Sequence, residues 1–142
     1  MRVVNAKITI VAIILLVLLA CSMIFPDTGT RTWTAVGDNG SEGLATGYIM
    51  VYSLDSLLIV QADDSTAGFV ETPGVTILYD EMPTPSAPGT QESYDVEELM
   101  PDTVYFFSVK AYDEALNFGL LGNIPRVVTP DTYRPAAIID LR

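Results

Sequence analysis

The sequence predicts an all-β fold of the sandwich or barrel type, and three observations lead to this prediction. Beyond position 30 the chain consists of short segments rich in Thr, Tyr, Val and Phe. Gly, Pro, Asp and Asn separate these segments at fairly regular intervals. No long stretch repeats apolar residues at helical spacing. Several short strands with regular turn signals are typical of a sandwich or a barrel rather than of a helical domain.

The clearest strands are expected over 104–112 and 48–52, where apolar and polar side chains alternate. Such alternation is typical of a strand with one buried face. The predicted inward face carries these residues: Tyr48, Met50, Tyr52, Tyr105, Phe107 and Val109. Weaker strands are expected over 91–96, 75–79 and 123–129. The segment 54–80 is the hardest to interpret, and a short helical turn over 57–61, capped by Ser53, fits part of it.

The opposite face of the two best strands suggests a surface for a partner. Ile49 and Val51 point away from the predicted core, and so do Phe106 and Tyr112 on the neighbouring strand. Four apolar side chains on one solvent-facing side could form a contact patch. The alternative is that the segment 54–80 folds over this face and covers it.

Composition excludes several classes of function. The 142 residues allow one ordinary domain with tails, and 7 basic against 18 acidic residues give a net charge of −11. This charge repels phosphate backbones and argues against nucleic-acid binding. The chain has no His and a single Cys, which removes His-dependent nucleophiles, His-ligated zinc and internal disulfides. We therefore expect a protein that is not an enzyme and has no cofactor.

Acidic residues in two predicted loops form the only candidate metal site. Asp38 and Glu42 follow one strand, and Asp113 and Glu114 follow another that ends at the same pole of a sandwich. Carboxylate oxygens from two loops can bind Ca²⁺. The alternative is that these residues are solvated turns that contribute solubility.

The N-terminus is predicted to direct export. Residues 1–20 contain two basic residues and then an apolar run over 8–20, which is shorter than the roughly 20 residues of a membrane-spanning helix. Residues 18–21, which end in Cys21, resemble the bacterial lipobox. This resemblance implies cleavage before Cys21 and acylation of its thiol. An uncleaved anchor and an ordinary cleaved signal are the alternatives, and all three place the acidic part outside the cytoplasm, at the cell envelope or surface.

Three stretches resemble, in the same order, parts of bacterial fibronectin type III domains. They are 32–40, 45–53 and 99–118, and the resemblance covers about 30–130. It implies a two-sheet, immunoglobulin-like sandwich.

The resemblance also implies roles for particular residues. Trp33, Tyr48 and Tyr105 would meet in a common core. Leu99 and Pro101 lead into Tyr105, whose hydroxyl would bond back to nearby backbone.

The sequence departs from the family at both ends of the domain. The family has a complete first strand before the Trp strand, whereas this chain has only a short predicted linker over 21–29. Gly29 and Arg31 occupy positions that are apolar in the family. Because a buried unpaired Arg is costly, Arg31 is expected to reach solvent, to pair with an acid, or to lie where the sheet is open.

The tail, 131–142, carries a segment that resembles the missing first strand, and three interpretations remain. The tail could begin the next domain of a truncated tandem array. It could fold back onto its own domain. It could also be donated to a neighbouring subunit, which would make a homo-oligomer by strand exchange. The apolar residues of this candidate strand are Ala136, Ala137, Ile138, Ile139 and Leu141.

The predicted function is that of a non-catalytic interaction or spacer module of the cell envelope, tethered to the membrane through Cys21. It would present loops and one sheet face to a protein or glycan partner. Because a fold does not determine a function, this step is an analogy. One alternative is a subunit of a surface fibre assembled by donation of residues 136–141. Another is an accessory domain left from a larger exported hydrolase.

Overall fold

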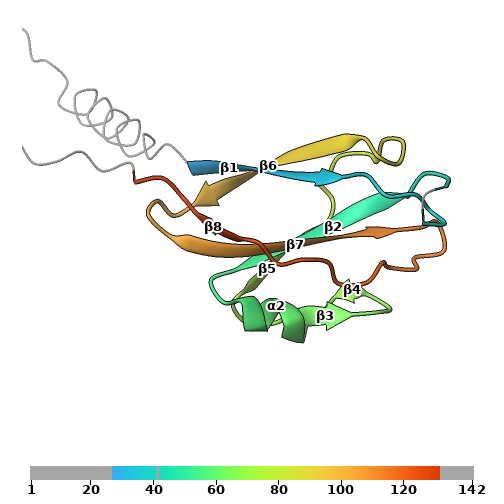
Figure 1. Ribbon diagram of the computed structural model, residues 1–142. Coiled ribbons are helices and arrows are strands. Elements are labelled where there is room, and N and C mark those ends of the chain that lie inside the picture. Colours follow the sequence, from blue (N-terminus) through green and yellow to red (C-terminus); the bar gives the residue numbers. More distant parts are fainter. Residues whose placement is uncertain (1–26, 41, 132–142) are drawn as a thin grey trace, which may run out of the picture.

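The computed structural model describes residues 27–40 and 42–131 and has three layers (Figure 1). The first layer is a two-stranded sheet of β1 (Asp27–Thr34) and β6 (Gln91–Leu99). The second is a four-stranded sheet in the order β5 (Val75–Leu78), β2 (Gly47–Ser53), β7 (Val104–Tyr112) and β8 (Arg126–Val128). The third consists of helix α2 (Ser56–Ala62) and a small hairpin of β3 (Asp63–Asp64) and β4 (Gly68–Phe69). All paired strands are antiparallel.

The main core lies between the two sheets. Its buried residues are Met50, Val96, Leu99, Tyr105 and Phe107. Trp33 packs against this cluster, and its ring meets that of Tyr48 edge-on with centroids 5.1 Å apart. The predicted inward faces of the two best strands are therefore confirmed. Of the three aromatic residues expected to meet, Trp33 and Tyr48 are in ring contact, and Tyr105 lies in the same core but packs against Tyr52 and Phe107.

A second core lies on the other face of the four-stranded sheet, and it corrects the predicted partner surface. Ile49 is 3% exposed and Val51 is 0% exposed, because α2 and the β3–β4 hairpin cover them. Phe106 packs against the same cluster, and Tyr112 stacks on Tyr79 with ring centroids 5.4 Å apart. Ile49, Val51 and Phe106 join two layers of the fold, and Tyr112 packs against Tyr79, so the four residues do not form an exposed patch. The segment 54–80 covers this face, as the alternative expected.

Two element boundaries differ from the prediction. β1 begins at Asp27, which pairs with Leu99, so residues 27–29 of the predicted linker belong to a strand. Pairing with a long neighbouring strand outweighs the weak strand propensity of these positions. Helix α2 is capped by Asp55, whose carboxylate accepts the N–H of Leu57 at 2.9 Å, and not by Ser53. The Ser53 hydroxyl instead donates to the Gly74 carbonyl at 2.7 Å.

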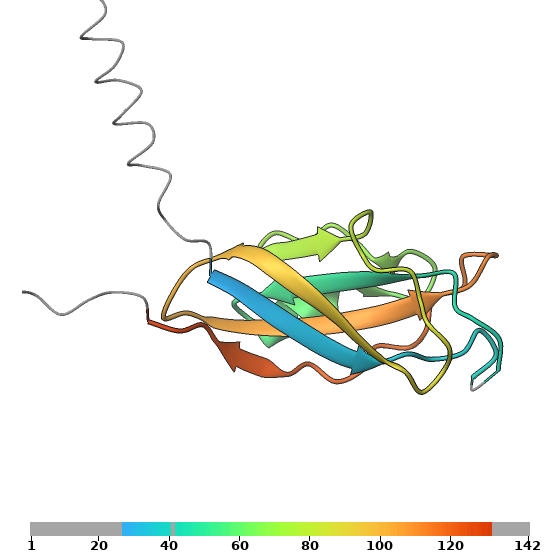
Figure 2. The same cartoon turned by 90° about the horizontal axis from the view of Figure 1, so that it is seen from above.

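The sandwich is open along two sides because two strands face four. Seen from above, β1 lies on the side of β8, and β6 lies on the side of β5 (Figure 2). β1 begins and β8 ends at the same pole: Asp27 pairs with Leu99, and the Asp102 N–H donates to the Pro130 carbonyl at 3.1 Å. Cys21 and the candidate strand 136–141 lie outside the described residues. Within the described part of the chain, no helix has the length and apolar character needed to cross a membrane.

Candidate functional site

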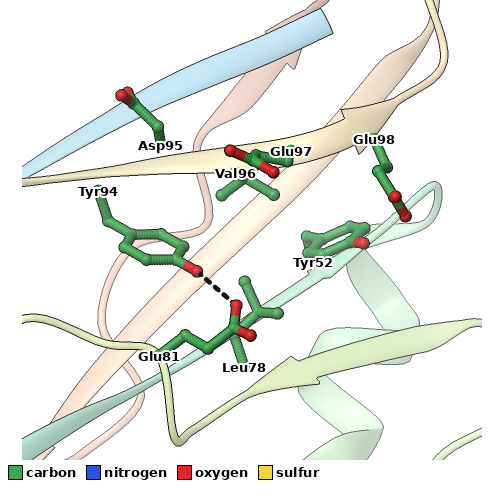
Figure 3. Close-up of a pocket in the computed structure, with 8 residues that line it drawn as sticks. All are labelled: Tyr52, Leu78, Glu81, Tyr94, Asp95, Val96, Glu97 and Glu98. Atoms are coloured by element: carbon green, nitrogen blue, oxygen red, sulfur yellow. Dashed lines mark hydrogen bonds between the residues drawn. The ribbon is translucent and has the colours of Figure 1, made fainter. Parts of the chain in front are cut away.

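The candidate functional site is a polar cleft on the open side between β5 and β6, called here the β5–β6 cleft. Its volume is about 570 Å³. Figure 3 shows its lining residues: Tyr52, Leu78, Glu81, Tyr94, Asp95, Val96, Glu97 and Glu98. Four of the eight carry a carboxylate and two carry a phenol ring, and none is basic. The cleft therefore offers negative charge beside aromatic rings.

An irregularity in β6 shapes one wall of the cleft. Asp27 pairs with Leu99 but Gly29 pairs with Val96, so β6 has one residue more than β1 at this point. Glu98 lies within this bulge and has a φ of 61°, a left-handed value that is uncommon outside Gly. Bulges change the direction of the side chains near them and are frequent beside binding sites. The local sequence thus places Glu98 at the cleft rather than in a regular ladder.

A hydrogen bond joins the two walls of the cleft. The Tyr94 hydroxyl on β6 donates to Oε2 of Glu81, which follows β5, at 3.2 Å (Figure 3). Partial burial, the hydrogen bond to Glu81 and the nearby charge of Glu97 raise the pKa of Tyr94. The phenol is therefore neutral and remains a donor at physiological pH. A cation that entered the cleft would meet carboxylates at its rim and the faces of Tyr rings, which attract positive charge.

The structure places the predicted calcium residues only partly together. Asp38 and Asp113 line one hollow at the same pole, whereas Glu42 and Glu114 do not line it. Among the described residues, no three acidic or other metal-binding side chains gather closely enough to hold a metal ion. The predicted calcium site is therefore wrong for these four residues.

The Asp113 carboxylate instead accepts hydrogen bonds from residues of its own loop. It accepts hydrogen bonds from the Asn117 side chain at 2.6 Å, the Asn117 N–H at 2.7 Å and the Ala115 N–H at 2.9 Å. These bonds, those of Asn117 first, lower the pKa of Asp113. Its oxygens shape a turn, which is the alternative that the sequence left open.

A buried lysine, which sequence reasoning did not single out, joins the second and third layers. The Lys110 side chain is 1% exposed and forms an ion pair with Asp63. Its Nζ donates to the carbonyls of Gly68 at 2.8 Å and Asp64 at 3.1 Å, and it lies 4.9 Å from the centroid of the Phe69 ring. All three ammonium hydrogens therefore have acceptors, which is what a buried charge requires.

Two expectations about the aromatic core are met. The Tyr105 hydroxyl accepts the N–H of Met100 at 3.1 Å, so the predicted bond from this ring to nearby backbone is confirmed. Arg31 lies where the sandwich is open, with its guanidinium carbon 4.4 Å from the centroid of the Phe107 ring. A Cβ at Gly29 would overlap Nη2 of Arg31, so the guanidinium would have to move if Gly29 were replaced.

Comparison of the chain with known protein families, with curated proteins and with solved structures finds no match.

Sequence reasoning missed the cleft and the lysine for the same reason. The cleft combines Tyr94 with Glu81 and Leu78, which lie on different strands and loops. Lys110 contacts Asp63 and Gly68, far away in the sequence. The available signal was weak: a single Lys on a strand face that also carries Phe106 and Tyr112 indicates a buried partner, but it does not identify the acidic residue.

Proposed function

We propose that this protein is a non-catalytic interaction module of a bacterial cell envelope, held at the membrane through an acylated Cys21. The β5–β6 cleft is its contact site, and a protein segment that carries Lys or Arg side chains is its partner. The observation that carries the binding proposal is the cleft itself, in which Glu81 and Glu98 lie beside Tyr94 and Tyr52 (Figure 3) and no basic residue is part of the lining. An anionic polymer would be repelled by the same charges.

Two features support the finer assignment to a fibronectin type III-like sandwich. The β1–β6 pair faces a separate sheet of β5, β2, β7 and β8. The Tyr105 hydroxyl near the start of β7 accepts a backbone N–H five residues upstream, which is the geometry of a tyrosine corner. Domains of this kind serve many functions, so the cleft, not the fold, supports the binding proposal.

The cleft is tested by titrating the full-length protein with a hexalysine peptide and following binding by calorimetry. Glu81→Gln removes a cleft charge, and Glu114→Gln removes the same charge from an exposed loop elsewhere. An exposed ion pair contributes up to about 1 kcal/mol, so we expect Glu81→Gln to weaken binding by about threefold to fivefold. Binding should also weaken with added salt.

Equal effects of the two substitutions would refute the cleft as the contact site. Binding of a neutral oligosaccharide in place of hexalysine, with loss of affinity on Tyr94→Ala, would point to a glycan partner instead. The membrane tether has a separate test, because mass spectrometry of the mature N-terminus distinguishes the three predicted outcomes. A diacyl adduct on Cys21 supports the proposal, and an intact Met1 refutes it.

A further inference from the structure

The open edge of β6 forms one wall of the β5–β6 cleft. Five consecutive β6 residues, 94–98, line the cleft, whereas β5 contributes only Leu78. Within the described residues, β6 pairs only with β1, so its other edge has no partner strand. An open strand edge offers N–H and C=O groups that favour the addition of another strand. The cleft therefore lies where an added strand would join the two-stranded sheet.

The register of β1 and β6 shows which backbone groups of β6 face the cleft. The Ala35 N–H donates to the Thr90 carbonyl at 2.7 Å, at the end of this antiparallel ladder. In such a ladder every second residue directs its N–H and C=O to the partner strand. The even-numbered residues of 92–96 therefore face β1, and Ser93 and Asp95 direct their backbone groups to the open edge.

The two faces of β6 beside the cleft differ in chemistry. Val96 is buried and Tyr94 is half-buried, and both pack in the main core. Asp95 and Glu97 are exposed on the opposite face, and Asp95 points away from Tyr52 (Figure 3). An added strand would thus meet apolar surface on its inner face and carboxylates on its outer face.

We propose that the basic partner segment binds as an added strand on the open edge of β6, with Lys or Arg at alternate positions and apolar residues between them. The basic side chains lie on the outer face beside Asp95 and Glu97, because opposite charges on neighbouring strands attract. The apolar side chains cover Tyr52, Leu78 and Tyr94, which pack against the main core at its edge. This inference rests on the proposed function and adds the conformation and residue pattern of the partner.

Charge selects such a partner over a second copy of this chain. Pairing of two β6 edges would bring Asp95 and Glu97 close to the same residues of the other copy. Like charges on neighbouring strands are destabilising, so the carboxylates keep this edge from pairing with itself. The bulge at Glu98 interrupts the regular ladder. We therefore expect a short added strand along residues 93–97, a length of about 17 Å.

The experiment titrates the full-length protein with two peptides of the same composition and charge, one alternating (Lys-Val-Lys-Val-Lys-Val) and one in blocks (Lys-Lys-Lys-Val-Val-Val). Two further alternating peptides carry backbone N-methyl groups, one on every Lys and the other on every Val. Neighbouring residues of a strand direct their N–H groups to opposite edges, so each methylated peptide loses the donors of one edge. Calorimetry gives the affinities, and amide hydrogen exchange reports individual N–H groups of β6.

We expect the alternating peptide to bind at least about fivefold more tightly than the block peptide. Only one of the two methylated peptides should lose affinity, by at least about tenfold, because an added strand bonds through one edge. In the complex, amide exchange of Ser93 and Asp95 should slow at least about tenfold. Exchange at Tyr94, which faces β1 in the ladder, should not change.

A matched pair of substitutions tests the outer face of β6. Glu97→Lys reverses a charge beside the added strand, and Glu114→Lys makes the same change in the exposed loop after β7. Glu97→Lys should weaken binding of the alternating peptide at least about fivefold. Glu114→Lys should weaken it by less than about twofold, because a distant exposed charge is screened by salt.

Several outcomes would overturn the added strand. Equal binding of the alternating and block peptides, or equal effects of the two methylations, would mean that side-chain charge alone holds the partner. Unchanged exchange at Ser93 and Asp95 would place the peptide away from the edge of β6. In these cases the proposed function still stands if hexalysine binding depends on Glu81. If neither hexalysine nor the alternating peptide binds, the proposed function falls together with the added strand.

Discussion

Substitution of Lys110 by Met should destabilise the fold more than any other single change of a charged residue described above. Met keeps an unbranched apolar stem and removes the ammonium group. The carbonyls of Asp64 and Gly68 lose their donor, and Asp63 loses its ion-pair partner. The effect therefore reports how strongly β7 holds the β3–β4 hairpin in the third layer.

The magnitude follows from these contacts. A hydrogen bond that involves a charged group contributes about 1.5–3 kcal/mol, and removal of one partner of a buried ion pair costs about 3–5 kcal/mol. The Asp63 side chain is 33% exposed and can be hydrated after the substitution, so we expect the lower end, about 3 kcal/mol. For a domain of this size this corresponds to a fall in Tm of about 12 °C or more.

The assay is equilibrium unfolding in guanidinium chloride, followed by far-UV circular dichroism and by Trp33 fluorescence. Coincident transitions of the two probes establish two-state behaviour. Arg126→Met on the exposed edge strand is the matched control and should stay within about 0.5 kcal/mol of the unmodified protein. Asp63→Asn keeps both carbonyl bonds of Lys110 but leaves the buried ammonium without its counter-charge, so it should also cost about 3 kcal/mol. If Lys110→Met unfolds with the same free energy as Arg126→Met, the lysine does not hold the layers together.

Three further predictions concern the cores and one loop. Tyr105→Phe should lower the free energy of unfolding by about 1 kcal/mol, because the partly buried Met100 N–H that its hydroxyl accepts loses this partner. An unchanged denaturation midpoint would contradict this. In α2, Ile59 is 0% exposed, so Ile59→Ala should lower the free energy of unfolding by about 2–5 kcal/mol. Leu57 is 65% exposed, so Leu57→Ala should lower it by less than about 0.5 kcal/mol. Similar denaturation midpoints for the two variants would mean that the helix does not cover the sheet. The pKa of Asp113 is lowered in the folded state from the ordinary value of 3.8. The ionised carboxylate therefore stabilises the fold fully at pH values above 3.8, and this stabilisation is lost as the pH falls through the folded-state pKa. Below pH 3.8 the free energy of unfolding should therefore decrease less steeply with falling pH for Asp113→Asn than for the unmodified protein. The same pH dependence in both proteins would argue against the loop hydrogen bonds.

The sequence by itself determined the local structure where a pattern depends only on neighbouring residues. The predicted strand over 104–112 matches β7 residue for residue, because alternation at a period of two assigns each side chain to a face. The same alternation placed Tyr105 and Phe107 in the main core, where the structure has them. The resemblance to a known family added the bond from the Tyr105 hydroxyl to nearby backbone, which the structure contains.

Only the tertiary structure decided what each face meets. Ile49 and Val51 have the pattern of an exposed apolar face, and a helix 56–62 that carries few local signals turns this face into a second core. The β5–β6 cleft and the ammonium site of Lys110 each join residues that are distant in the sequence. Such contacts depend on how whole layers pack, and the free energy of that packing is shared among many residues rather than encoded in one segment. The strands can thus be predicted from local sequence, whereas the cleft and the lysine site form only when the layers pack together.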